Sequence, residues 1–314
     1  MMMLHVASLV YLIHVLLNHK KLKQLLREIE QFWKSKLLNN EIYFLNNLTN
    51  TNRIITHSYI WFALIATVLF SSLPMIPKIM DIIVPLNESR PTIFIYQSEY
   101  FIDPIKYENL IFIHSYIVTM YPTIVLVGYD SLYSNLAQHS SCLFEIVSNH
   151  IKNTQLPDKK IYSNNSLSQY DYHAIFYKDC IQRHRVAQKF TSSIKSVYNI
   201  PLFFMLGLNM IAVSLAGCQV LLTLDQPSQA MRFCIFAVSA LIHLYFLSWA
   251  GQKVIDSSSK IYQSEWYQAN NTTQKFLIIF MMASREPYNL TAGKLWILSS
   301  ENFTVGNKLF HNAY

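Results

Sequence analysis

Glycine, cysteine and charged residues are scarce in this chain. Its 314 residues include 6 glycines and 4 cysteines, and only 14% are charged, against roughly 25% in soluble domains. So few glycines provide no loop for cradling phosphate. Cys142, Cys180, Cys218 and Cys234 show no C-x-x-C spacing, and the histidines form no H-E-x-x-H arrangement. We therefore expect no cofactor, no metal site and no enzymatic activity.

What the chain has in quantity is apolar sequence. Apolar residues make up 52% of the chain and aromatic residues 14%, and the mean hydropathy is +0.21. The net charge of +7 could suggest nucleic acid as a partner. However, the lysines and arginines occupy separate loops and form no single stripe, which is typical of membrane orientation. The expected partner is a lipid bilayer, and nucleic acid is not expected.

Several uncharged runs approach or exceed the roughly 20 residues that a helix needs to cross a bilayer. Backbone polar groups in lipid must be satisfied internally, so these runs should be helices. The predicted fold is all-α, a polytopic transmembrane bundle with about six spanning helices. The uncharged runs are Met1–Leu17, Ile54–Pro77, Asn109–Tyr129, Ser196–Leu224 and Phe233–Gln252, with a shorter one at Phe276–Ala283. A last apolar run, Leu295–Phe310, is interrupted by Glu301 and Lys308.

The first run could alternatively be a secretory signal peptide. A signal peptide carries positive charge before its apolar core. Here Lys20, Lys21, Lys23 and Arg27 follow the run instead. A membrane helix is therefore favoured over a cleaved signal.

Loop charges predict the orientation. Lysine and arginine are abundant in 18–53 and 139–195, whereas acidic residues outnumber them in 78–108. The basic loops should face the cytoplasm, which places 78–108 and the C-terminus outside. A G-protein-coupled receptor has the opposite sense at its C-terminus, and neither an acidic-Arg-Tyr triplet nor an Asn-Pro-x-x-Tyr motif is found. Asn87-Glu-Ser is a glycosylation sequon in the loop expected outside.

The last fifty residues carry the most specific pattern. It consists of Tyr262, Trp266-Tyr267, Gln274-Lys275, Pro287, Ala292-Gly293-Lys294, Leu298-Ser299 and Phe303. This series resembles the C-terminal signature of insect odorant receptors, which are seven-helix ligand-gated cation channels. Segments 81–103, 139–147 and 22–33 also resemble parts of hymenopteran members, with 22–33 expected to be helical. On this resemblance the chain lacks the family's first helix and part of its last.

The resemblance implies a role and partners. The chain should be an odorant receptor subunit in the plasma membrane of olfactory sensory neurons. It should bind a small volatile odorant and gate a cation channel with the family's shared co-receptor. A gustatory receptor is an alternative on the same fold, but its usual Thr-Tyr and Gln-Phe C-terminal pattern is absent. A secondary transporter would need midplane ionisable residues, which the charge-free runs do not supply.

The resemblance also implies a division of the chain and a set of sites. Residues 1–255 should form the ligand-binding bundle, 256–290 a cytoplasmic anchor and 291–314 an incomplete pore-lining helix. Tyr262, Trp266 and Tyr267 should contact other subunits. Odorant pockets should be apolar with few polar groups, and the alternative for each pocket residue is ordinary packing between helices. The expected pocket residues are Phe62, Ala66, Phe70, Phe112, Ser115, Thr119, Phe236 and Ser239.

Overall fold

The computed structural model describes residues 2–35, 39–85, 90, 93–96, 98–104, 106–154, 169–262, 274, 275, 278, 280–282 and 285–304. The chain forms two compact units, and each is built from three separate stretches. The first unit comprises 1–17, 55–131 and 203–246, and the second comprises 18–54, 132–202 and 247–314. The boundaries between these stretches fall inside the five long helices, so each of the five contributes one end to each unit.

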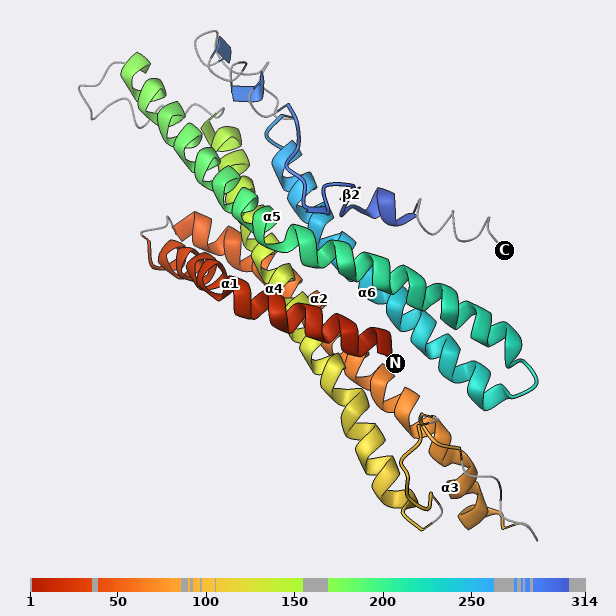
Figure 1. Cartoon of the computed structure of the whole chain (residues 1–314). Helices are drawn as coiled ribbons and strands as arrows, with labels where there is room; N and C mark the ends of the chain where they lie inside the picture. Colours follow the sequence, from red (N-terminus) through yellow and green to blue (C-terminus); the bar gives the residue numbers. More distant parts are fainter. Residues whose placement is uncertain are drawn as a thin grey trace. The chain divides into compact units, whose positions relative to one another are not determined.

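Long helices dominate the described residues (Figure 1). Five of them are long and apolar enough to cross a membrane. A 3-10 turn, Leu73–Met75, joins α2 to α3. The helices are α1 (Met2–Lys34), α2 (Asn39–Ser72), α3 (Ile76–Ile83), α4 (Glu108–Thr154), α5 (Gln169–Leu222) and α6 (Pro227–Ser259).

The apolar runs from Met1 to Gln252 are confirmed as helical. The basic stretches 18–53 and 139–195, which were expected to be loops, are largely helical where the structure describes them. Helix α1 continues without a break through 18–34, which confirms the helix expected at 22–33. Leu22 and Leu25 are buried on one face of this extension, while Lys34 pairs with Glu30 on an exposed face at 2.5 Å. An amphipathic pattern of this kind continues a helix beyond its membrane-length segment.

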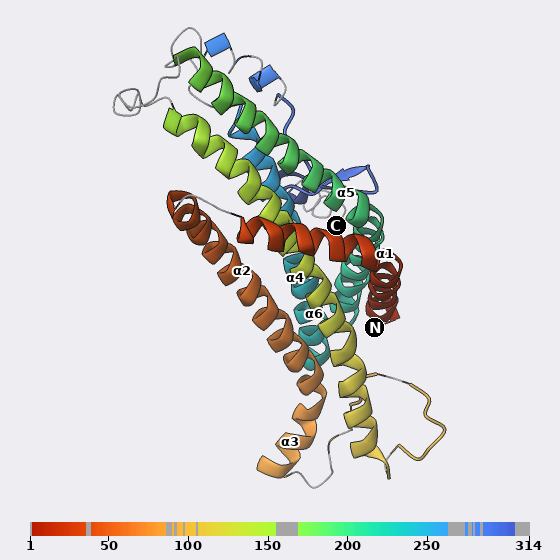
Figure 2. The same ribbon diagram turned by 90° about the vertical axis from the view of Figure 1, so that its left-hand side faces the viewer.

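In the first unit, α2 and the first part of α4 run side by side (Figure 2). The Thr67 and Thr123 hydroxyls meet across this contact at 3.2 Å. The end of α5 and the start of α6 form an antiparallel pair joined by a short turn. On α2, Ala66 faces the interior, whereas Trp61 and Ile65 on another face are 65% and 54% exposed. Such apolar exposure suits a surface in contact with lipid.

In the second unit, aromatic and ionic contacts hold the helices together. His139 of α4 lies edge-on between Phe32 and Phe190. Near the end of α4, His150 pairs with the buried Glu41 of α2. Glu145 of α4 pairs with Lys260, just past the end of α6. Leu45, Cys142 and Ile146 form an apolar cluster between α2 and α4. These contacts show that the helices of this unit pack around a shared core.

A β-hairpin follows at the C-terminal side of the second unit. Strands β1 (Thr291–Ala292) and β2 (Trp296–Ile297) are antiparallel. Gly293 and Lys294 in the turn have φ of 64° and 61°, which an α-helix does not allow. The expected helix start at Leu295 is therefore wrong, and helical structure begins at residue 300. The rest of that predicted helix, from 305 onwards, lies outside the described residues.

Candidate ligand-binding site

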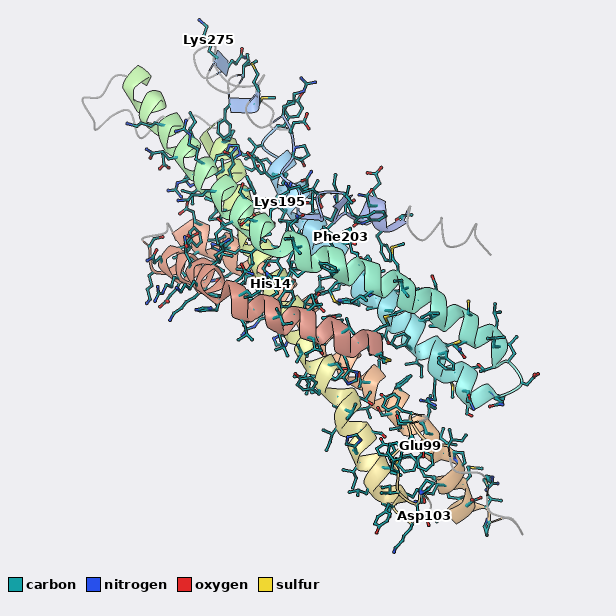
Figure 3. All side chains as sticks on the ribbon, viewed as in Figure 1. His14, Glu99, Asp103, Lys195, Phe203 and Lys275 are labelled. Atoms are coloured by element: carbon teal, nitrogen blue, oxygen red, sulfur yellow. The ribbon has the colours of Figure 1, made fainter. Side chains whose placement is uncertain are left out.

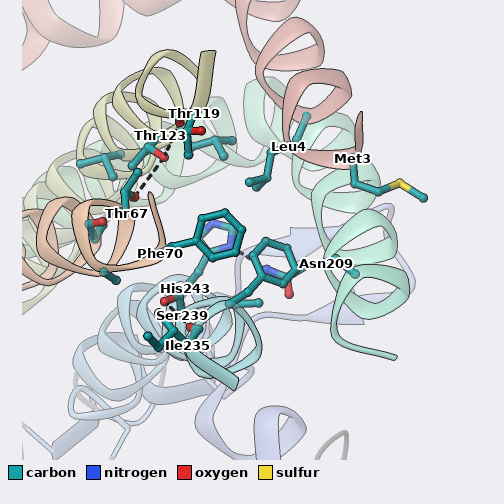
Figure 4. Close-up of a pocket in the computed structure, with 18 of the residues that line it drawn as sticks. Met3, Leu4, Thr67, Phe70, Thr119, Thr123, Asn209, Ile235, Ser239 and His243 are labelled. Carbon is teal, nitrogen blue, oxygen red and sulfur yellow. Dashed lines mark hydrogen bonds between the residues drawn. The ribbon is translucent and has the colours of Figure 1, made fainter. Parts of the chain in front are cut away.

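A cavity of about 140 Å³ lies inside the first unit (Figure 4). It is surrounded by α1, α2, α4, α5 and α6, so that each of these helices supplies part of its wall. Most of the lining is aliphatic or aromatic. The lining residues are Met3, Leu4, Ala7, Tyr59, Phe62, Ala63, Ala66, Thr67, Phe70, Thr119, Thr123, Leu126, Val127, Met205, Leu208, Asn209, Ala212, Ile235, Phe236, Ser239, Ala240 and His243.

One wall of the cavity is aromatic, and an arginine side chain packs against one of its rings. The rings of Phe70 and Phe236 are 6.4 Å apart and tilted by 50°. The Arg232 guanidinium stacks 5.0 Å from the Phe70 ring centroid and donates a hydrogen bond to the Ile95 carbonyl at 2.8 Å. This cation–π contact fixes the Phe70 ring against the cavity. The hydrogen bond from Arg232 to Ile95 joins the segment between α3 and α4 to α6.

That connecting segment is held to α4 by tyrosines. Tyr96 and the cavity residue Thr119 share a hydrogen bond, and the Tyr100 hydroxyl lies 3.1 Å from His114 Nδ1. Burial raises the pKa of Tyr96 above its usual value. Figure 3 shows Glu99 and Asp103 of the same segment beside the start of α4. The segment thus reaches the cavity lining through its contact with Thr119.

Beneath the cavity is a buried polar cluster centred on Asp130 of α4. The Asp130 side chain is fully buried and accepts hydrogen bonds from Tyr11 at 3.1 Å and Tyr59 at 2.9 Å. His243 Nε2 lies 3.1 Å from Asp130 Oδ2. Asn209 of α5 is 2.7 Å from the other ring nitrogen of His243. Four helices therefore meet at one carboxylate, and α5 joins them through His243.

Six of the eight expected pocket residues line the cavity. They are Phe62, Ala66, Phe70, Thr119, Phe236 and Ser239. The other two point elsewhere: Phe112 packs against Phe94 with ring centroids 5.6 Å apart, and Ser115 lies 3.4 Å from the Tyr100 hydroxyl. The placement of these residues does not test ligand binding, which stays a prediction.

The other predicted sites are only partly within the described chain. Tyr262 is 47% exposed and therefore available for a contact. Trp266, Tyr267 and Asn87 lie outside the described residues. Across the described ranges, no three His, Cys, Asp or Glu side chains are placed to hold a metal ion.

Sequence reasoning missed the α5 wall, to which Met205, Leu208, Asn209 and Ala212 contribute. It also missed Tyr59. The uncharged run Ser196–Leu224 is apolar on all sides, so it gives no indication of which face lines a cavity. A polar residue within it, Asn209, was the available signal, because buried amides in membrane helices seek partners on neighbouring helices.

The fold and the cavity are those of a polytopic helical membrane protein. Residues 1–304 match the 7tm Odorant receptor family, and the chain belongs to that family. Odorant receptor 67a of Drosophila melanogaster is 26% identical over 129 residues, which are 40% of this chain and 31% of that protein. The match thus covers about a third of the relative's length.

Solved structures show the same fold. The insect olfactory receptor OR5 from Machilis hrabei in complex with eugenol superposes with a TM-score of 0.75, at 10% identity, over 99% of this chain and 77% of that one. A second structure of OR5 superposes with a TM-score of 0.68 at the same identity and coverage. At such low identity the likeness supports the fold alone.

Proposed function

We propose that this chain binds a small, mainly apolar odorant in the cavity of its first unit and gates a cation channel together with a co-receptor subunit. The observation that carries the proposal is the cavity itself, which is walled by apolar side chains from five helices. Its volume of about 140 Å³ resembles that of a dry protein cavity of about 150 Å³ that binds benzene. A compact volatile molecule suits this space.

Family membership and the exposed apolar helix faces support a multi-pass membrane receptor. The partner and the cellular setting belong to the proposal. We expect Tyr262, Trp266 and Tyr267 to contact the co-receptor, because aromatic residues are enriched in interface cores. We place the protein in the plasma membrane of olfactory neurons with its C-terminus outside, as the loop charges indicate.

A matched pair of substitutions on α2 tests where the ligand binds. Ala66 is buried in the cavity wall, whereas the neighbouring Ile65 is 54% exposed. Ala66→Phe should fill the cavity and raise the half-maximal concentration for odorant-evoked current at least about tenfold, which corresponds to about 1.4 kcal/mol. Ile65→Phe should change it little. Both variants are measured in cells that also express the co-receptor.

Surface expression of each variant is quantified in the same cells, so that a folding defect is separated from lost binding. Equal responses of the two variants at equal surface levels would show that odorants act outside this cavity.

A further inference from the structure

The cavity contains a buried acceptor with no partner. Asn209 is 8% exposed and lines the cavity from α5 (Figure 4). Within the described part of the chain, its Oδ1 atom has no hydrogen-bond partner. An unpaired buried amide oxygen is unusual, because more than nine in ten buried polar groups find a partner. The oxygen is therefore available to accept a hydrogen bond from a molecule bound in the cavity.

The orientation of the amide follows from the cluster beneath the cavity. The Asp130 carboxylate lies 3.1 Å from His243 Nε2 and favours a proton on that nitrogen. In a neutral imidazole protonated there, Nδ1 is an acceptor. Asn209 Nδ2 then donates to Nδ1 across 2.7 Å. The amide nitrogen thereby faces His243, and Oδ1 is left over as the acceptor.

The hydroxyl protons of the lining are already used within the protein. Three hydroxyl groups donate to carbonyls one turn back in their own helices: Thr67 to Ala63, Thr119 to Ser115, and Ser239 to Ile235. Thr123 does the same more loosely, at 3.3 Å from the Thr119 carbonyl. The Tyr59 hydroxyl donates to Asp130. A ligand in this cavity therefore meets a mainly apolar wall, and among the lining residues that the structure describes Asn209 Oδ1 is the side-chain oxygen that has no hydrogen-bond partner.

We infer that Asn209 Oδ1 anchors the ligand and selects compact odorants that carry a hydroxyl group, such as small alcohols and phenols. This rests on the proposed cavity binding and specifies its ligand class. A hydroxyl donates to Oδ1 while the hydrocarbon part packs on Phe62 and Phe70. A ligand lacking a donor leaves the buried oxygen unpaired, and such mismatches strongly reduce affinity.

Three probes of one ring and similar size test the anchor. Benzyl alcohol has a donor, benzaldehyde has only an acceptor, and ethylbenzene has neither. Affinity is taken from the dose-dependent thermal stabilisation of the detergent-solubilised full chain. The wild type should bind benzyl alcohol at least about tenfold more tightly than either other probe. Asn209→Leu should remove this preference and leave ethylbenzene affinity within about twofold.

The control is Thr67→Val, which removes a cavity hydroxyl whose proton is already used and should retain the alcohol preference. Equal wild-type affinity for all three probes would overturn the anchor while leaving cavity binding in place. A preference for benzaldehyde would also overturn the anchor. It would mean that the Asn209 amide turns its nitrogen, and not its oxygen, towards the ligand. If no probe stabilises the chain, and Ala66→Phe leaves odorant responses unchanged, the cavity proposal itself fails.

Discussion

Asp130 places a carboxylate with no solvent exposure inside a membrane-length helix. Such residues are costly in a bilayer and are retained where partners compensate them. Here the partners are two tyrosine hydroxyls and a histidine, contributed by α1, α2 and α6. The carboxylate therefore links the helices around the cavity, and its closeness to His243 Nε2 favours a proton on that nitrogen.

Removing this carboxylate should destabilise the first unit. Asp130→Leu leaves the Tyr11 and Tyr59 hydroxyls without their acceptor, and each buried donor left unsatisfied costs about 1–3 kcal/mol. We expect a marked fall in the thermal midpoint of the solubilised protein, followed by fluorescence-detected size exclusion. Asp225→Asn, in an exposed turn, is the control and should be neutral. An unchanged midpoint for Asp130→Leu would show that the cluster adds no net stability.

At this scale the sequence predicted part of the cavity. Phe62, Ala66 and Phe70 recur at helical spacing, and the structure places all three on the lining. The same reasoning put Phe112 in the cavity, although it packs on Phe94 from the segment between α3 and α4. Helical spacing defines a face but not the neighbour that covers it. Asn209 could not be ranked because its importance depends on His243 and Asp130, which are distant in sequence.

Among the elements, the hairpin β1–β2 departs most from expectation. It is held to α5 through Asn199, whose Oδ1 accepts hydrogen bonds from Thr291 at 3.1 Å and from the Lys294 amide at 2.9 Å. Residues 291–297 contain no Pro and only one Gly, so their composition did not exclude a helix. Contacts with a distant asparagine decide the conformation, and these contacts cannot be read from local sequence.

The hairpin also requires a glycine on α6. A Cβ atom at Gly251 would lie 2.3 Å from the Leu298 carbonyl oxygen and 2.7 Å from Leu298 Cβ. The backbone after β2 thus packs directly on the helix at this point. A side chain at Gly251 has no room unless the hairpin moves.

Gly251→Ala should therefore detach the hairpin from α6 and destabilise the second unit by about 1–3 kcal/mol, the usual cost of overpacking. Limited proteolysis in detergent should show faster cleavage near residues 285–300. Gly207→Ala is the matched control, because a Cβ there meets nothing within 4 Å. That variant should gain roughly 0.5–1 kcal/mol from helix propensity. Identical behaviour of the two variants would argue against a close contact at Gly251.

For the whole molecule, composition and charge-free runs were sufficient to predict a helical membrane protein. They succeed because a bilayer demands long apolar helices regardless of how the helices pack. The two units were not predictable in the same way. Each collects stretches far apart in sequence, so contacts between helices define them. The predicted division at 255 and 290 follows the family's sequence order and stays a prediction.

Orientation in the membrane can be tested with two of the chain's sequons, in a variant whose other sequons, at Asn47, Asn270, Asn271, Asn289 and Asn302, are removed by substitution to Gln. Asn87-Glu-Ser lies in the acidic 78–108 segment and Asn164-Asn-Ser lies in the basic 139–195 segment. The excess of lysine and arginine predicts that the second segment stays in the cytoplasm, where no glycan is added. A mobility shift on glycosidase treatment should therefore disappear in Asn87→Gln and persist in Asn164→Gln. If Asn164→Gln abolishes the shift instead, the chain has the opposite orientation, and its C-terminus lies in the cytoplasm.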